Sequence, residues 1–335
     1  MRLRRLARGC GFGLLALAIL GIGIWCGVGL WYQLKLPEPV RLIPPGLTAI
    51  LTLIAVFSLA TRKRWIGIGA FLGAFVAFLV WWASITPRTD RHWAAEVARI
   101  PTAVLSGDNA VVSNVRNFAW RSETDFDPVW ETRTYDLSTI TDVDLIMSYW
   151  MGEAIAHTII SFGFTDGQRL AFSIETRKER HEGFSSVAGF FKQFELAIVA
   201  ADERDVVRIR SNIRGEDVRL YRLRMSPVDA GLLFREYLEQ ANDLARTPRF
   251  YNTATSNCTT LVFDMVRVIH PGLPLDYRVI LAGYLPDYAY AVGALDTDLP
   301  FARLREVARI HDNAIQADID PDFSAKIREH VPKPH

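Results

Sequence analysis

The residues with the clearest chemical potential lie at positions 251–260, which read Y-N-T-A-T-S-N-C-T-T and lead into the apolar segment 261–270. Leu261 and Met265 share one face of a helix, which predicts a helix over this apolar segment. The turn-rich decapeptide before it therefore places Cys258 at the start of that helix. Unpaired N–H groups and the positive end of the helix dipole favour a thiolate at that position. A thiolate is the form of cysteine that attacks carbonyl carbon. The pattern therefore indicates a candidate nucleophile, with a small buried cysteine as the alternative interpretation.

A histidine that could act as the base lies in a predicted β-hairpin at residues 154–176, which turns at an Asp-Gly pair. His157 lies near the open end of the first strand. Counting outward from the turn, the residue opposite is Thr176 if the loop has an even number of residues, and Glu175 if it has three. Either way a hydroxyl or a carboxylate lies within reach of the imidazole. The alternative interpretation of His157 is a core histidine with satisfied hydrogen bonds.

Metal and cofactor motifs are absent from the sequence. His181 lies between Glu179 and Glu182, but the charged run 177–182 is typical of a solvated face. The sequence contains no H-E-x-x-H motif, no G-x-S-x-G elbow and no P-loop. We therefore predict neither a metal nor a cofactor.

Three stretches near the N-terminus lack charged residues over about the 20 residues that a membrane-spanning helix needs. They lie between Arg8 and Lys35, between Arg41 and Arg62, and between Arg64 and Arg88. The first is too long for the apolar part of a cleaved signal peptide, and no small-residue cleavage site follows it before Lys35. Tryptophans near the ends of the stretches are typical of membrane interfaces. We expect three transmembrane helices.

The distribution of basic residues predicts the orientation of these helices. Four arginines precede the first helix, and Arg62, Lys63 and Arg64 form the loop between the second and the third. The positive-inside rule places both in the cytoplasm, so the chain after Arg88 is expected outside it. Two of the three cysteines lie in the first helix, which leaves Cys258 as the sole thiol of the remaining domain. It has no partner there for an internal disulfide.

Composition and patterning define the rest of the chain. Half of the 335 residues are hydrophobic and the formal net charge is +1, which argues against a nucleic-acid partner. We predict four regions: a membrane anchor at 1–87, a linker helix at 88–109, a main domain at 110–275 and a helical extension at 276–335. In the linker, residues 89–100 carry the helical pattern. The predicted strands are 110–118, 143–150, 194–200 and 218–224, with a loop at 119–135, a helix from Ser226 to about Ala245, helices at 282–294 and 301–315, and a frayed end.

Four ordered blocks of the main domain resemble the Lnb-type N-terminal periplasmic domain family, whose name comes from a bacterial lipoprotein N-acyltransferase. The blocks read A-H-T-I-I-S-F-G-F, S-I-E-T-R-K-E, F-E-L-A-I-V-A-A-D-E-R-D and Y-N-T-A-T-S-N-C-T-T, at 156–164, 173–179, 194–205 and 251–260. The resemblance covers roughly Arg116 to His270. It implies an α+β fold, a circularly permuted papain/NlpC-like domain with an antiparallel sheet and packed helices. In the acyltransferase that names the family, the membrane helices follow this domain, whereas here they precede it.

The resemblance identifies Cys258 as the motif cysteine and His157 as the motif histidine. It implies a thiol acyltransferase of the bacterial inner membrane that moves an acyl chain from phospholipid to an amine, such as a lipoprotein N-terminus or a peptide. We expect Glu175 to orient the imidazole. Tyr251, Asn252, Asn257 and Arg177 are the candidates for stabilising an oxyanion or positioning substrate. The alternatives are a cysteine amidase or peptidase acting on cell-wall peptides or envelope proteins, and a non-catalytic anchored envelope protein.

Overall fold

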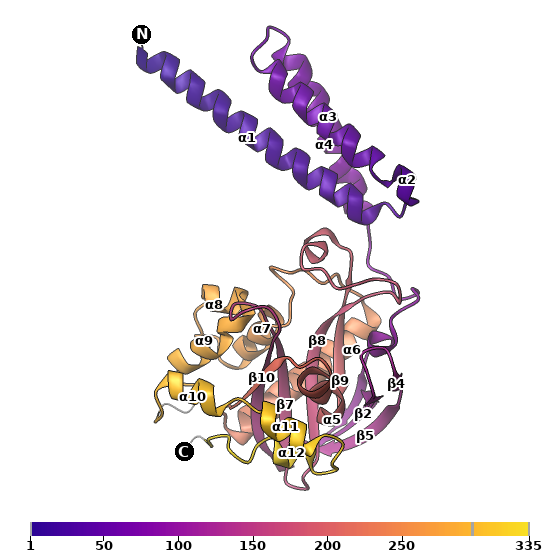
Figure 1. Cartoon of the computed structure of the whole chain (residues 1–335), viewed down its shortest axis with the longest axis vertical. Helices are drawn as coiled ribbons and strands as arrows, with labels where there is room; N and C mark the ends of the chain where they lie inside the picture. The colour runs from indigo at the N-terminus through magenta and orange to yellow at the C-terminus, as the bar shows by residue number, and fades with distance from the viewer. Residues whose placement is uncertain (1, 296–297, 334–335) are drawn as a thin grey trace. The chain divides into compact units, whose positions relative to one another are not determined.

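The computed structural model describes residues 2–295 and 298–333, which form two compact units. One unit consists of Met1–Arg88 together with Ser185–Gln193, and the other of Thr89–Phe184 with Phe194–His335. Residues 276–333 therefore lie in the same compact unit as the predicted main domain. Figure 1 shows the helices of the first unit in indigo and violet and the sheet of the second unit in purple to pink.

The first unit is built from apolar helices, as expected. They are α1 (Arg2–Gln33), the short α2 (Glu38–Arg41), α3 (Ile43–Ser58) and α4 (Arg64–Ser84). Three spans are long and apolar enough to cross a membrane: Cys10–Gln33, Glu38–Ser58 and Arg64–Ser84. Most of their side chains face outward, because only a narrow seam around Ile19, Ala55 and Phe71 is buried between the helices. Apolar residues exposed all round a helix are typical of contact with lipid.

The second unit is organised around an eight-stranded sheet. Seven of its strands run in the spatial order β1 (Thr102–Ser106), β2 (Asn109–Arg116), β9 (Glu195–Ala201), β8 (Arg169–Arg177), β7 (Ala156–Phe164), β6 (Ile140–Tyr149) and β10 (Asp217–Arg222), and β5 (Trp130–Asp136) also pairs with β2. Every pair is antiparallel except β2 with β9, which is parallel, so the sheet is mixed. The strands β3 (Ala119–Trp120) and β4 (Phe126–Asp127) form a separate small hairpin. The expected α+β class is confirmed.

Helices cover both faces of this sheet (Figure 1). On one face lies α6 (Pro227–Arg246), where Phe234 and Tyr237 pack on the rings of Phe162 and Phe172. On the other face lie α5 (Glu203–Val206), the π-helical turn η4 (Ile209–Ile213), α11 (His311–Ala317) and α12 (Phe323–Lys326). Because side chains alternate along a strand, each central strand sends one set of residues to each layer.

The linker helix predicted at 88–109 is wrong. The segment contains only the short 3-10 turn η1 (Ala95–Val97), and Thr102–Ser106 pairs with β2 as strand β1. The backbone around Trp93 instead bonds to the chain beyond β8, where Trp93 forms a bridge with Glu179. Pairing with a neighbouring segment satisfied the backbone groups that a helix would have satisfied internally.

Three further predictions need correction. The predicted loop at 119–135 contains β3, β4 and most of β5, whose outward residues are polar because one face of this edge of the sheet meets water. The predicted helix at 301–315 is divided into α10 (Phe301–Val307) and α11, because the backbone at Ala308 and Arg309 bonds to β10. The frayed end predicted for the last dozen residues is wrong at Ile327, which is fully buried, and residues 334–335 lie outside the described part of the chain.

Candidate active site

The loop at 251–259 holds Cys258 in place just before α7 (Thr260–Ile269). The Asn257 Oδ1 atom accepts hydrogen bonds from the N–H groups of Thr259 and Thr260, at 2.8 and 2.9 Å. Asn252 Oδ1 accepts in the same way from Ala254 N and Thr255 N. The two asparagines therefore shape the loop, and Asn257 serves the first turn of the helix as an N-cap residue would. Their predicted role toward an oxyanion stays a prediction.

The Cys258 thiol is buried, with 7% of the residue exposed, and contacts the start of β7. It is hydrogen-bonded to the imidazole of His157 and to the backbone N–H of Thr158. The Thr259 hydroxyl lies 3.8 Å from the sulfur. Two residues that are about a hundred positions apart in the chain are thus joined in one site, as the sequence predicted.

Glu175 is the residue that faces His157 on the neighbouring strand. The β7–β8 register pairs Ile159 with Ser173 and Gly163 with Arg169, and its continuation places Glu175 opposite His157. The Glu175 Oε1 atom lies 3.2 Å from His157 Nε2. The three-residue loop is therefore the correct alternative, and Thr176 points to the opposite face of the sheet.

Ser173 lies between the histidine and the carboxylate and was not predicted. Its Oγ is 2.6 Å from His157 Nε2 and donates to Glu175 Oε1 at 2.7 Å. A hydroxyl has a single proton, so the Ser173 oxygen accepts a hydrogen bond from the Nε2–H of His157. This fixes a proton on Nε2 and directs the other ring nitrogen, Nδ1, to a different partner.

Arg210 completes the site from the η4 turn and was also not predicted. Its NH2 group donates to Glu175 Oε1 at 2.7 Å, and NH1 lies 3.8 Å from a carboxylate oxygen of Glu216. The guanidinium is nearly fully buried. Arginines alternate with apolar residues at V-V-R-I-R, and this pattern was the only sequence signal that one of them faces the interior. Arg210 balances the charge of Glu175 inside the protein.

The electrostatics favour a thiolate beside a protonated histidine. Burial and Arg210 lower the pKa of His157, but Glu175 and the hydrogen bond to Cys258 outweigh them and raise it to about 9. Burial raises the pKa of Cys258, yet the hydrogen bond and the charge of His157 bring it below its ordinary value. Burial likewise raises the pKa of Glu175, whereas His157 and Arg210 hold it well below its ordinary value. Glu175 is therefore ionised and stabilises the imidazolium.

Two tyrosines lie near the sulfur. Burial raises the pKa of Tyr251, and the charges of Cys258 and Glu175 raise it further, so its hydroxyl keeps its proton. Burial and the charge of Cys258 also raise the pKa of Tyr237. The Tyr237 hydroxyl has no hydrogen-bond partner among the residues that the structure describes. Protonated phenols near a thiolate are potential donors to an oxygen that gains negative charge.

Arg177 does not belong with the thiol in this structure. Its guanidinium donates to the carbonyl oxygens of Val97 and Ala98, at 3.1 and 2.8 Å, and lies 4.4 Å from the ring centroid of Trp93. These contacts join β8 to the chain that follows the membrane helices. Two nitrogens of the guanidinium are engaged in this connection, and the predicted role of Arg177 in positioning substrate stays a prediction.

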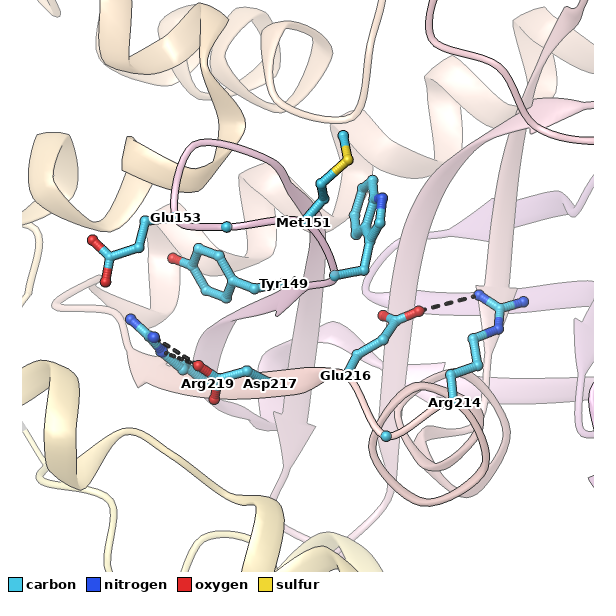
Figure 2. A pocket seen from close by; sticks show the side chains of 10 residues that line it. Tyr149, Met151, Glu153, Arg214, Glu216, Asp217 and Arg219 are labelled. Atoms are coloured by element: carbon cyan, nitrogen blue, oxygen red, sulfur yellow. Dashed lines mark hydrogen bonds and ion pairs between the residues drawn. The ribbon is translucent and has the colours of Figure 1, made fainter.

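A cavity of about 400 Å³ lies beside the histidine end of β7. Figure 2 shows its lining, with Tyr149, Met151 and Glu153 on one side and Glu216 and neighbouring residues on the other. Ser148, the register partner of His157, donates to the carboxylate of Glu216. Glu216 therefore lines the cavity and also lies beside Arg210, the residue that pairs with Glu175.

One group of side chains in the described part of the chain has metal-ligand geometry. The ligand atoms of Glu179, His181 and Glu182 lie within 4.8 Å of one another. His181 is exposed, and Glu182 already accepts a hydrogen bond from the Glu179 backbone.

Residues 126–283 match the family model of the Lnb N-terminal periplasmic domain. This segment is an Lnb N-terminal periplasmic domain. It contains β4 to α8 (Tyr277–Ile280) and therefore all of the groups assembled around Cys258. No curated protein and no solved structure matches the chain. Three membrane-length helices precede the Lnb domain, which is consistent with a membrane-anchored protein, and the papain-like permutation stays a prediction.

Proposed function

We propose that this protein is a membrane-anchored Cys-His thiol acyltransferase that moves an acyl chain from a phospholipid to an amine. The observation that carries the proposal is the buried chain Cys258–His157–Glu175, in which the thiol pKa is lowered and the histidine pKa is raised. An activated nucleophile, a base and a group that orients the base are the parts that covalent acyl transfer needs.

In the first half-reaction, the Cys258 thiolate attacks the ester carbonyl of the phospholipid. The C–O bond of the ester breaks as the thioester forms, and the leaving alkoxide takes a proton from the imidazolium of His157. In the second half-reaction, an amine attacks the thioester and passes a proton to His157. The C–S bond breaks, an amide forms, and the thiolate and imidazolium are restored.

The oxygen of each tetrahedral intermediate needs hydrogen-bond donors. The backbone N–H of Cys258 and the protonated hydroxyl of Tyr251 are the donors that we assign to this role. We assign no metal or other cofactor to the reaction. The acceptor is proposed to be the N-terminal amine of a lipoprotein or peptide.

We further propose that the protein resides in the bacterial cytoplasmic membrane, with its N-terminus inside and the Lnb domain in the periplasm. The basic residues of the N-terminus and of the Arg62–Arg64 loop support this orientation. A lipid substrate requires an enzyme at the bilayer, and three membrane-length helices meet this requirement.

The test is to incubate the purified full chain with phospholipid that carries a labelled acyl chain and to determine the intact mass. We expect an adduct of one acyl chain on Cys258 that hydroxylamine removes, and none with Cys258→Ala. Ser256→Ala is the matched control, because it changes a neighbouring loop residue and should keep the adduct. Adding a peptide amine should discharge the adduct as an amide.

Other outcomes separate the rival functions. Cleavage of murein or envelope peptides that depends on Cys258, without a lipid-derived adduct, would identify an amidase or peptidase that uses water as the acceptor. A Cys258→Ala protein that retains full function in cells would contradict both enzymatic proposals and support a non-catalytic envelope protein.

A further inference from the structure

The segment Ser185–Gln193 belongs to the loop between β8 and β9, yet it forms a compact unit with the membrane-length helices. It contains the short 3-10 helix η3 (Ala188–Phe191). The segment lies outside the hydrogen-bonded chain around Cys258. Its contacts with the helices therefore need a separate explanation.

The inner side of the segment packs on the C-terminal ends of α1 and α4. The ring of Phe191 stacks on Tyr32, with centroids 5.8 Å apart, and lies 6.5 Å from Trp82 in an edge-on contact. The side chain of Gln33 donates to Phe191 O at 2.7 Å. An aromatic cluster thus joins the segment to residues that end two membrane spans.

Lys192 strengthens this attachment electrostatically. Its Nζ donates to Trp82 O at 2.8 Å and to Ile85 O at 3.3 Å, and it lies 5.0 Å from the Trp82 ring centroid. The last carbonyl groups of a helix have no partner within the helix, and this end of the dipole is negative. The Lys192 ammonium group at the end of α4 donates to these carbonyl groups and places a positive charge at the negative end of the dipole.

The outer side of the segment is apolar and uncovered. Val187 and Phe190 are 52% and 46% exposed. They belong to the same compact unit as the ends of spans α1 and α4, where tryptophan and tyrosine mark the boundary between lipid and water. Exposed apolar side chains in a segment packed on the ends of such helices are suited to the bilayer itself.

We propose that residues 185–193 form an interfacial anchor, with Val187 and Phe190 inserted among the lipid chains at the bilayer surface. The occupant of this apolar surface is the membrane in which the three helices reside. Because Ser185 follows Glu175 by ten residues and ten residues extend at most about 35 Å, the anchor sets an upper limit on the distance between the bilayer surface and Glu175. The site-bearing sheet is thereby tied to the membrane at a second point, independent of the chain after α4.

The test places a polarity-sensitive fluorophore on single cysteines of the full chain in phosphatidylcholine vesicles. Cys10, Cys26 and Cys258 are replaced by alanine, and Val187→Cys and Phe190→Cys are labelled separately. Ile319→Cys is the matched control, since this side chain is 77% exposed but lies between Asp318 and Asp320. We expect blue-shifted emission at 187 and 190, and several-fold stronger quenching by lipids with a nitroxide near the headgroup than at 319.

Two results would overturn the proposal. Emission at 187 and 190 equal to that at 319 would place both side chains in water, and a blue shift without lipid quenching would mean that protein covers them. Hydroxyl-radical footprinting of the unsubstituted protein provides a second measurement that does not depend on the cysteine-free background. We expect Phe190 to be protected in vesicles while Tyr277, which is 65% exposed between Asp276 and Arg278, is oxidised. Equal oxidation of the two would contradict the anchor.

Discussion

At the scale of single residues, the site couples one thiol to a series of charged groups that leads into the protein interior. His157 receives support from both Ser173 and Glu175, and Arg210 in turn neutralises Glu175. His157 lowers the pKa of Cys258, Glu175 raises the pKa of His157, and Arg210 lowers the pKa of Glu175. The ionisation of the thiol therefore depends on residues that do not touch it. This dependence can be measured without knowing the substrate.

The ionisation of Cys258 predicts its reactivity with iodoacetamide. We expect alkylation to persist below the pH range of an ordinary cysteine and to disappear as pH falls through the lowered pKa of the thiol. Peptide mass spectrometry measures the rate at each pH. His157→Gln should move the midpoint up toward that of an ordinary thiol, because the imidazolium charge is lost. An unchanged midpoint would contradict the assigned role of His157.

The raised pKa of His157 predicts how acyl-transfer activity falls at high pH. The imidazolium is present below its pKa and is lost as pH rises through about 9, so acyl transfer that needs this acid should decline there. Glu175→Gln removes the carboxylate that raises the pKa, and we expect the decline to move to lower pH. Thr176→Ala, on the opposite face of β8, is the control and should leave the profile unchanged.

The size of the Glu175 effect can be estimated. A hydrogen bond to a charged group contributes about 1.5–3 kcal/mol, so we expect Glu175→Gln to slow alkylation of Cys258 at neutral pH by about tenfold to 100-fold. Ser173→Ala should have a smaller effect, because the direct contact between His157 and Glu175 remains. A larger loss with Ser173→Ala than with Glu175→Gln would contradict this order.

At the scale of secondary-structure elements, strand β8 connects three functions through its alternating side chains. Ser173 and Glu175 face the histidine, Phe172 on the other face packs under α6, and Arg177 binds the backbone of the linker at Val97. The loop that follows β8 contains the proposed membrane anchor. One strand therefore joins the site, the core and the membrane-proximal segments.

The C-terminal segment is held to the sheet by buried charges. Arg328 donates to Asp144 Oδ2 at 2.8 Å and to Glu203 Oε2 at 2.7 Å, and both carboxylates are fully buried. We expect Arg328→Ala to lower the free energy of unfolding of this unit by about 3–5 kcal/mol, because it leaves the buried Glu203 carboxylate without its ion-pair partner, whereas Asp144 keeps Arg169 and Arg222. Arg303→Ala breaks an exposed ion pair with Glu306 and should cost less than about 1 kcal/mol.

Denaturant titration of both variants across pH provides the measurement. Burial raises the pKa of Glu203, but Arg328 outweighs it and lowers this pKa to about 2. The stabilisation is therefore complete above the ordinary pKa of a glutamate and is lost as pH falls through about 2. The difference between the wild-type chain and Arg328→Ala should shrink over that range. Equal effects of the two substitutions at neutral pH would show that Arg328 is not structural.

At the scale of the whole molecule, three membrane-length helices precede an Lnb domain in one chain. The proposed orientation predicts where a reporter fused to the chain is active. Alkaline phosphatase needs disulfides that form outside the cytoplasm, so a fusion after His335 should be active and a fusion after Arg62 inactive. The reverse pattern would contradict the proposed periplasmic location, and the substrates would then have to be sought in the cytoplasm.

Local patterns of sequence were sufficient for the features that depend on neighbouring residues. Apolar length determined the membrane spans, the Asp-Gly turn determined the β7–β8 hairpin, and the quoted blocks identified the Lnb domain with Cys258 and His157. These features follow from burial, turn geometry and residue type over short stretches, which a sequence displays directly.

Only the tertiary structure decided the features that depend on register and on distant packing. A shift of one residue exchanges Glu175 for Thr176 beside the histidine, and the three-residue loop settled that choice. Arg210 reaches Glu175 because η4 packs across the sheet, a contact between residues 35 positions apart. Arg328 is buried because α12, which it follows, packs on the same face of the sheet as α5 and η4. A charged residue in a sequence is expected to face solvent. It can be buried only where the fold brings an oppositely charged partner to it, and that partner is often distant in the chain.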